Sequence, residues 1–235
     1  ADWNTTISAA NGLKHSISKG EHQRYIFRDT GWVKDTATID MLLVNSPEVS
    51  QSLGAHAAKI RMLEAQDLTN VAAENSNAQF YIRDVGYLEY KIPGSTALGD
   101  VTRAGRDDKI IQNERNRVKA DAVYYQGNEA GCGLAWVNKT PSAYNMLGTS
   151  STHCGLSVMR HEFGHNMGLN HHDTTDVARG FAHPLGSTIM GGNALPFFSS
   201  PSLYHPKYGY RLGIQGQIDS LTLMNQNAPF VAQFR

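Results

Sequence analysis

The stretch that decides the fold of this 235-residue chain reads His161-Glu162-Phe163-Gly164-His165-Asn166-Met167-Gly168-Leu169-Asn170-His171. His161 and His165 are four residues apart, so on a helix they project from one face, one turn apart. His171 lies six residues further on, a step that would turn its ring far around a continuing helix. Gly168 resolves this difficulty, because glycine adopts the positive φ that ends a helix and lets the reversed chain return. The spacing therefore predicts a helix that ends near Gly168 and three imidazoles that meet.

Three neutral imidazoles can bind a zinc ion tetrahedrally at about 2.0–2.1 Å and leave a fourth position for water. We therefore expect His161, His165 and His171 to hold one catalytic Zn²⁺. Glu162 adjoins the first histidine, where its carboxylate can approach the water without binding the metal. Zinc lowers the pKa of such a water toward about 7, and a carboxylate can accept its proton as it attacks a carbonyl. The pattern predicts a peptide hydrolase with Glu162 as general base.

Other readings of the same residues stay open at this stage. The histidines could be exposed or packed in a core, and His172 could replace His171 as a ligand. A structural zinc ion usually takes a fourth protein ligand and has no need of Glu162. A non-catalytic zinc-binding or adhesion protein could also retain the motif, although the intact Glu162 argues against it.

The composition limits the classes of partner. The chain has 21 basic and 21 acidic residues and a formal net charge of zero, which predicts no general attraction to nucleic acid or anionic lipid. No apolar stretch is long enough to span a bilayer, so we expect no membrane insertion. A chain of this length can form one domain, and we expect a monomer that acts on polypeptide substrates. The sequence has no EF-hand-type loop, and calcium binding stays open.

The first residues favour an exported protein, and the two cysteines allow a disulfide. Ala1-Asp2 lacks an initiating methionine and a signal-like segment, which suggests that a signal and a propeptide have been removed and predicts secretion. Cys132 and Cys154 are the two cysteines, and they are compatible with one disulfide that closes a loop of roughly 20 residues. Two free thiols, or zinc binding by these cysteines, are the alternatives.

Strands and helices alternate along the chain. We expect strands at 38–44, 78–90, 122–125 and 133–137, and helices at about 50–74, 101–119, 156–167 and 217–225. In the first helix Ile60, Leu63, Leu68 and Val71 should face inward. Residues 1–35 should form an extension with strand character at 25–27, and residues 169–213 should be rich in loops. This order predicts an α+β fold with a mixed, twisted sheet and covering helices.

The histidine motif resembles the long zinc signature of the metzincin metallopeptidases, and Ser187-Thr188-Ile189-Met190-Gly191 resembles their Met-turn. Over roughly residues 37–235 the chain is most similar to the bacterial reprolysin-like and peptidyl-Asp metallopeptidases. The resemblance implies one catalytic domain over 1–235, with an upper subdomain at about 36–168 and a small lower subdomain at about 169–235 that ends in a helix. It also implies that Met190 forms a hydrophobic base beneath the zinc site, although an ordinary core methionine is the alternative.

The resemblance also assigns substrate-binding residues. The strand that contains Leu134, Ala135 and Trp136 is similar to the edge strand that pairs with substrate in metzincins. The peptidyl-Asp group cleaves on the amino side of Asp, which requires a cation in the pocket after the scissile bond. By position after the Met-turn we expect Lys207 or Arg211 to supply it, although surface cations are commonly only solvated. A reprolysin-like protease or toxin without this preference is the other possibility.

Two departures from the family pattern are visible. His172 stands between the third histidine and Asp173, whereas many reprolysins have Asp directly after that histidine. Gly192 stands where related metzincins have a tyrosine two positions after the methionine. A tyrosine ligand from that position is therefore absent, and other donors must stabilise the oxyanion.

Overall fold

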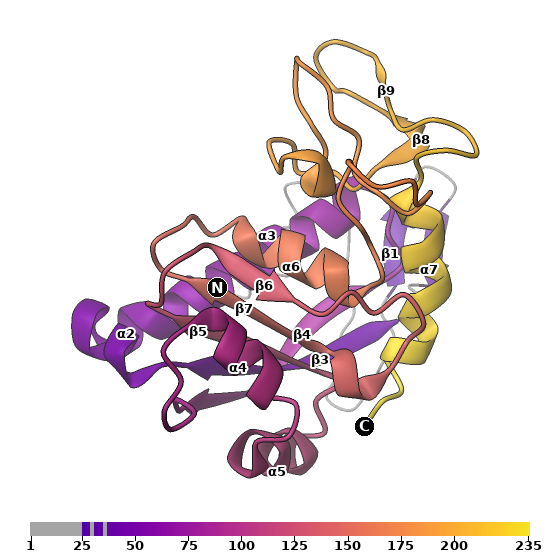
Figure 1. The fold of residues 1–235 in the computed structure, drawn as a ribbon. Coiled ribbons are helices and arrows are strands. Elements are labelled where there is room, and N and C mark those ends of the chain that lie inside the picture. Colours follow the sequence, from indigo (N-terminus) through magenta and orange to yellow (C-terminus); the bar gives the residue numbers. More distant parts are fainter. Residues whose placement is uncertain (1–24, 29–30, 35–36) are drawn as a thin grey trace.

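A five-stranded sheet lies at the centre of the computed structural model, which describes residues 25–28, 31–34 and 37–235 (Figure 1). Its strands are β3 (Thr38–Asn45), β4 (Tyr81–Glu89), β5 (Ala122–Gly127), β6 (Gly133–Ala135) and β7 (Leu147–Ser151). The strand order is β4-β3-β5-β7-β6, and every neighbouring pair is parallel except β6 and β7. This arrangement confirms the predicted mixed sheet, and it leaves β4 and β6 as the two edges.

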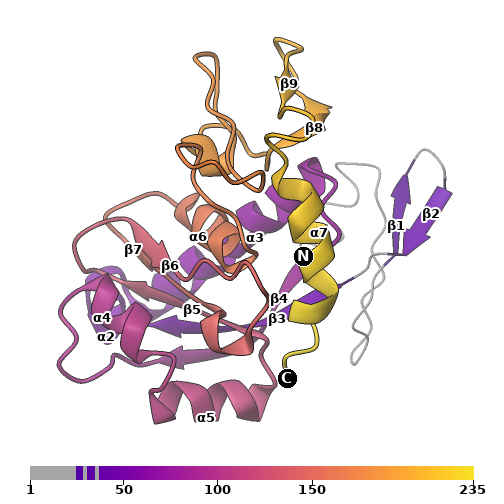
Figure 2. The ribbon, with the colours of Figure 1, turned by 45° about the vertical axis from the view of Figure 1, so that its right-hand side comes forward.

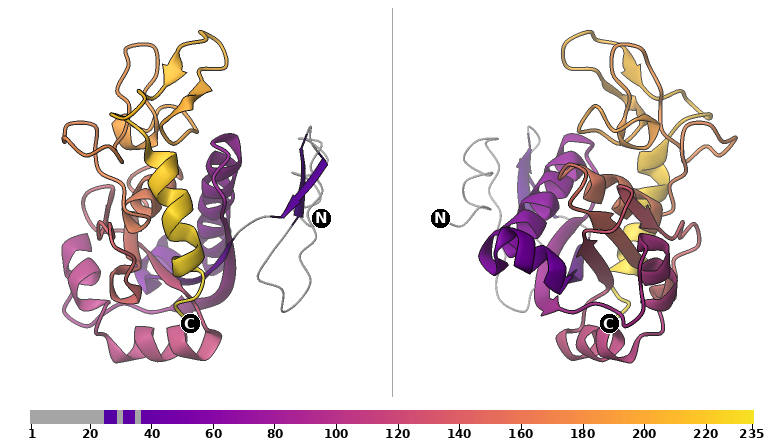
Figure 3. Two further views of the ribbon diagram at one scale, coloured as in Figure 1. Left: turned by 90° about the vertical axis from the view of Figure 1, so that its right-hand side faces the viewer. Right: turned by 60° about the vertical axis from the view of Figure 1, so that its left-hand side comes forward.

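Helices cover both faces of the sheet, and β3 shows why. All eight residues of β3 are buried, so successive side chains enter two different cores. Met41 and Leu43 join a core with α3 (Ala55–Asn75) and α6 (Val158–Asn166), whereas Leu42 and Val44 join a core with α4 (Leu98–Ala104) and α5 (Lys109–Val118). The two views in Figure 3 show α4 and α5 on the side of the sheet away from α3.

Within the central sheet the strand predictions hold except at one position, and the short strands β8 and β9 in the loop-rich stretch were not predicted either. β3, β4, β5 and β6 fall within or close to the expected ranges. β7, which lies between β5 and β6, was not predicted. Its sequence, Leu-Gly-Thr-Ser-Ser, offers neither an apolar run nor a clear alternation, so only its pairing with both neighbours makes it a strand.

Two of the expected helices are each divided. The first becomes α2 (Pro47–Leu53) and α3, because Gly54 between them has a φ of 88° and interrupts the helical backbone. The second becomes α4 and α5. Asp108 begins α5 as its N-cap and accepts hydrogen bonds from the backbone nitrogens of Ile110 and Ile111. A cap residue in the middle of the expected 101–119 helix was the signal for this break.

The predicted inward face of α3 is wrong in part, although Leu63 does pack against the core. Ile60 and Leu68 are both 38% exposed, whereas Met62 is buried, as are the polar residues Gln66 and Asn70. Asn70 exchanges hydrogen bonds with the backbone of Ile82 on β4, at 2.8 Å in each direction. Because polar residues occupy much of the buried face, the apolar periodicity indicated a direction that is rotated from the buried side of the helix.

Apart from η1 (Ala143–Asn145), which lies between β6 and β7 in the sequence, the remaining elements follow α6 or precede β3. They are η2 (Ile189–Gly191), β8 (Ser200–Tyr204), β9 (Arg211–Leu212) and α7 (Ser220–Val231), and Figure 2 shows the loop-rich stretch between α6 and α7 at the end of the molecule away from α5. β1 (Tyr25–Arg28) and β2 (Gly31–Lys34) pair antiparallel, and the rest of the expected N-terminal extension lies outside the described residues. The division at about residue 168 into two subdomains stays a prediction. Over the residues that the structure describes, no helix is long and apolar enough to cross a bilayer.

The corrected face of α3 can be tested with a matched pair of substitutions. Met62→Ala should lower the free energy of unfolding by about 2–5 kcal/mol, because it removes a buried side chain and leaves a cavity. Ile60→Ala on the exposed side should cost under about 1 kcal/mol. Urea unfolding followed by circular dichroism would measure both values, and a larger loss for Ile60→Ala would contradict the observed orientation.

Candidate metal centre

Helix α6 ends as its glycine predicts. Gly168 has a φ of 103°, which confirms the expected positive φ. The backbone nitrogen of Leu169 donates to the Gly164 carbonyl at 3.0 Å, and that of Gly168 donates to the His165 carbonyl at 2.9 Å. These two bonds form a Schellman motif, in which the left-handed residue turns the chain away from the helix axis. The turn brings His171 back toward the helix.

The structure brings the three predicted histidines together. Nε2 of His171 lies 3.0 Å from Nε2 of His161 and 3.0 Å from Nε2 of His165. Tetrahedral zinc with bonds of about 2.05 Å would separate two ligand nitrogens by about 3.3 Å, so the spacing fits such an ion. Among the described residues this is the group whose ligand atoms lie close enough together to hold a metal ion.

The outer nitrogens of two rings are fixed by backbone carbonyls. Nδ1 of His161 lies 3.0 Å from the Ile189 carbonyl oxygen, and Nδ1 of His165 lies 2.7 Å from that of Leu169. A carbonyl can only accept, so each Nδ1 carries the proton and each Nε2 presents its lone pair to the centre. Burial lowers the pKa of His161 and lowers that of His165 to about 4, which keeps these rings neutral at physiological pH. Neutral rings are the form that binds a metal.

Glu162 projects from α6 toward the edge strand β6. Glu162 is 7% exposed, and burial raises the pKa of its carboxyl group to about 8 when no metal ion is bound. A Cβ atom on Gly133 would lie 2.7 Å from Glu162 Oε1, so only glycine at that position of β6 leaves room for the carboxylate. A nearby dication would favour the ionised form. The carboxylate thus lies in a confined space between α6 and β6, one residue along the helix from His161, where it can exchange a proton.

Met190 lies directly against α6. It is 2% exposed, and its Sδ atom would lie 2.7 Å from a Cβ atom on Gly164. The same short helix, η2, supplies the Ile189 carbonyl that accepts from His161. This segment therefore packs against the helix between the two helical histidines and orients one of them. The role of Met190 as a base beneath a zinc ion stays a prediction.

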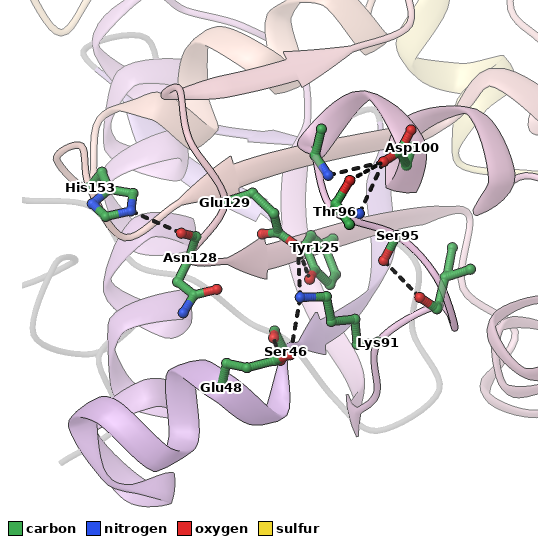
Figure 4. Close-up of polar contacts among 12 residues, drawn as sticks. Ser46, Glu48, Lys91, Ser95, Thr96, Asp100, Tyr125, Asn128, Glu129 and His153 are labelled. Carbon is green, nitrogen blue, oxygen red and sulfur yellow. Dashed lines mark hydrogen bonds and ion pairs between the residues drawn. The ribbon is translucent and has the colours of Figure 1, made fainter.

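A hydrogen-bonded cluster fixes the loop that leads into β6 (Figure 4). The Tyr125 hydroxyl donates to Glu129 Oε1 at 2.8 Å, and Lys91 Nζ lies 3.6 Å from the same oxygen and 3.0 Å from Glu48 Oε1. His153 Nε2 donates to the Asn128 carbonyl at 2.9 Å. The loop between β5 and β6 is thereby attached through Glu129 to Tyr125 and Lys91, and through the Asn128 carbonyl to His153.

The disulfide expected as one alternative for the cysteines is present at the start of β6. It joins Cys132 and Cys154, whose Cα atoms are 5.2 Å apart. Both cysteines are therefore oxidised in this bond, so neither is a free thiol or a metal ligand.

The other predicted substrate residues lie in different surroundings. The Trp136 ring faces α4, where its Nε1 donates to the Thr102 carbonyl at 2.7 Å, so its side chain is directed away from the histidines. Leu134 is 46% exposed on the free edge of the sheet. Arg211 and Lys207 lie at or near the β8–β9 pair, both exposed, and Arg211 Nη1 donates to the Pro201 carbonyl at 2.6 Å. Their roles in binding substrate stay predictions.

Two residues beside the site escaped the sequence analysis. Arg160, directly before His161, is 7% exposed and donates to the side-chain oxygen of Asn193 at 2.7 Å and to its carbonyl at 3.0 Å. Asn193 in turn donates to the Ser157 carbonyl at 2.9 Å. No local pattern indicates this contact, because 33 residues separate the two side chains and neither belongs to a motif.

A comparison of the sequence with known protein families indicates the same class of protein as the fold and the histidine cluster. The sequence matches Reprolysin_5, metallo-peptidase family M12, over residues 35–192, which is more than half of the chain. The chain therefore belongs to metallo-peptidase family M12, a class of metal-dependent peptide hydrolases, and the resemblance to metzincin metallopeptidases is confirmed.

The chain is also similar to individual proteins, one of which is named as a metalloendopeptidase. The chain is 24% identical over 245 residues to the peptidyl-Asp metalloendopeptidase of Pseudomonas aeruginosa, a match that covers 84% of this chain and 40% of that protein. It is also similar to a chain in a structure described as a chaperone-substrate complex, with a TM-score of 0.86 and 55% identity over 93% of this chain and 38% of that chain. The chain thus spans about 40% of the length of the curated relative.

Zinc content would test which histidines bind. Replacing His161, His165 or His171 with Ala should raise the dissociation constant for zinc by at least about 100-fold, because loss of a direct ligand costs more than loss of an outer partner. His172→Ala is the matched control, because its ring is exposed and belongs to no described metal cluster. Competition with a chromophoric chelator gives each constant. A loss of zinc with His172→Ala and none with His171→Ala would reverse the assignment.

Proposed function

We propose that this chain is a zinc-dependent endopeptidase that hydrolyses peptide bonds with Glu162 as general base. The observation that carries the proposal is the meeting of three Nε2 atoms, in which that of His171 lies 3.0 Å from each of the other two, next in sequence to the buried Glu162. Membership of metallo-peptidase family M12 supports the same class of reaction. The three side chains His161, His165 and His171 would hold the ion.

When bound, zinc supplies a Lewis acid that polarises the scissile carbonyl and lowers the pKa of water. Glu162 accepts the proton of the attacking water, and as a carboxylic acid it donates that proton to the leaving nitrogen. The carbonyls of Ile189 and Leu169 keep two of the imidazoles in the tautomer that presents Nε2. Because these donors and acceptors are already in place, little reorganisation accompanies the reaction.

The free edge of β6 would hold the substrate backbone. Cys132 accepts from the nitrogen of Ser151 on β7, so by antiparallel alternation Leu134 also faces β7, and Thr149 Oγ1 donates to its carbonyl at 3.1 Å. The backbone groups of Gly133 and Ala135 therefore point outward. An extended peptide can pair with them by strand addition.

Cleavage on the amino side of Asp and secretion are the finer parts of the proposal. The name of the Pseudomonas aeruginosa relative, peptidyl-Asp metalloendopeptidase, supports the Asp preference. The disulfide supports secretion, because such bonds persist in oxidising compartments. A reprolysin-like peptidase without the preference is the second candidate, and the low identity of 24% favours keeping it.

Glu162→Gln separates catalysis from metal binding. The variant should keep about one zinc ion per chain, because Glu162 is not among the three clustered ligands, yet kcat should fall by about 10²–10⁴-fold, because the amide cannot accept the proton. Glu114→Gln on the outer helix α5 is the control and should leave kcat unchanged. Zinc analysis and cleavage of a quenched fluorescent peptide measure both properties, and full activity in Glu162→Gln would exclude its role as base.

Mapping the cut sites in a denatured protein tests the substrate preference. Mass spectrometry of the products should show cleavage mainly before Asp, and a zinc chelator should abolish it. Cuts spread evenly over many residues would support the reprolysin-like alternative. Binding of zinc without any cleavage would support a non-catalytic protein.

A further inference from the structure

The Arg160 guanidinium is a buried cation without an ion pair in the part of the chain that the structure describes. Its Nε and Nη2 atoms each donate one hydrogen bond to Asn193, whereas Nη1 donates none to the residues that the structure describes. Nη1 is not fully buried, so a ligand can reach it. A buried charge normally requires an opposite charge, so a site that leaves donors unused favours an anionic ligand.

Arg160 and Glu162 project from opposite flanks of α6. They are two residues apart, a rotation of about 200°, and the histidines lie between them. On the Glu162 flank α6 packs against Gly133 of β6, and on the Arg160 flank it packs against Met190 and Asn193. A peptide that crosses the histidine face is therefore bounded by β6 on one side and by the segment after Met190 on the other.

The direction of β6 predicts which part of a bound peptide reaches Arg160. Gly133 lies against Val158 and Glu162 near the start of α6, whereas the Trp136 carbonyl accepts from Asn166 at its end, so β6 and α6 run in the same direction. Antiparallel pairing is the more stable choice for a strand added at an edge. A peptide in that direction passes the histidines and continues toward the first turn of α6. The residue after the scissile bond thus approaches the end that carries Arg160.

We propose that Arg160 binds the side-chain carboxylate of the substrate residue that follows the scissile bond, and so sets the preference for Asp. This inference rests on the proposed peptidase function. The planar guanidinium can present two parallel N–H groups to a carboxylate. Asn193 holds the guanidinium by its other edge and is itself fixed to Ser157 and Thr188, so the donors are oriented before the ligand arrives. An Asn side chain carries no charge and offers only one acceptor oxygen to the same group.

Other cations in the chain after α6 fit this role less well. Arg211 and Lys207 are exposed, and the rings of Tyr204 and Tyr208 lie beside their charges. Nη1 of Arg179 already donates to the Thr174 carbonyl. Of these residues only Arg160 directly adjoins one of the three histidines, His161. It is also buried, on the flank of α6 that faces Met190 and Asn193.

The test uses two peptides that differ only by Asp or Asn after the scissile bond. Arg160→Met should lower kcat/KM for the Asp peptide by about 10- to 150-fold, the range expected for a lost hydrogen bond to a charged group. The Asn peptide should change by less than about threefold. Arg117→Met on the outer helix α5 is the matched control and should leave the ratio of the two kcat/KM values unchanged. Arg160→Lys should restore part of the preference, because it keeps the charge and loses the two-pronged geometry.

A binding measurement separates this inference from the proposed function. Zinc-loaded Glu162→Gln should bind the Asp peptide more tightly than the Asn peptide, and Glu162→Gln combined with Arg160→Met should bind both equally. An equal fall in cleavage of both peptides by Arg160→Met would show a purely structural role and overturn the inference. Loss of the Asp preference in Arg211→Met would also overturn it. If the unmodified chain cleaved neither peptide with zinc present, the proposed function itself would fail.

Discussion

The site depends on two hydrogen bonds from imidazole nitrogens to backbone carbonyls. Nδ1 of His161 donates to Ile189 at 3.0 Å, and Nδ1 of His165 donates to Leu169 at 2.7 Å. Without these bonds either tautomer would be available and the rings could rotate. With them, both Nε2 atoms face the position that His171 also reaches. One carbonyl comes from the turn that ends α6 and the other from η2, so the helix, its end and the Met190 segment must all be in place together.

Glycines allow the close packing that these bonds require. Gly164 leaves room for Met190, and Gly133 leaves room for Glu162. A Cβ atom on Gly180 would lie 2.1 Å from the Met190 carbonyl carbon, so the chain after His171 can approach the same segment only as glycine. Backbone and side chain thus meet within van der Waals distance on several sides of α6, which explains how a site of few residues can be rigid.

The two flanks of α6 give the site a direction. On one flank Glu162 faces the edge strand, whose entry loop is held by Glu129, Lys91 and the disulfide. On the other flank Arg160 is held by Asn193. Chemistry at the scissile bond and recognition of the next residue would therefore use two positions of one helix that are two residues apart, and the rotation of about 200° between them separates the two functions.

The sequence by itself determined the parts of this protein that depend on local spacing. Residues 161–171 predicted the helix, its end at Gly168 and the meeting of three histidines, because helical periodicity and the φ of glycine are local properties. The buried run in β3 likewise identified a central strand.

Only the tertiary structure decided the rest. Strand β7 has no apolar pattern and forms because two neighbours pair with it, and α3 buries Gln66 and Asn70 because β4 provides their hydrogen-bond partners. The Trp136 ring turns toward α4 to reach the Thr102 carbonyl, and Arg160 gains its place from Asn193, 33 residues away. In each case a polar group is buried only because a partner distant in sequence satisfies it, and that pairing is not encoded in any local pattern.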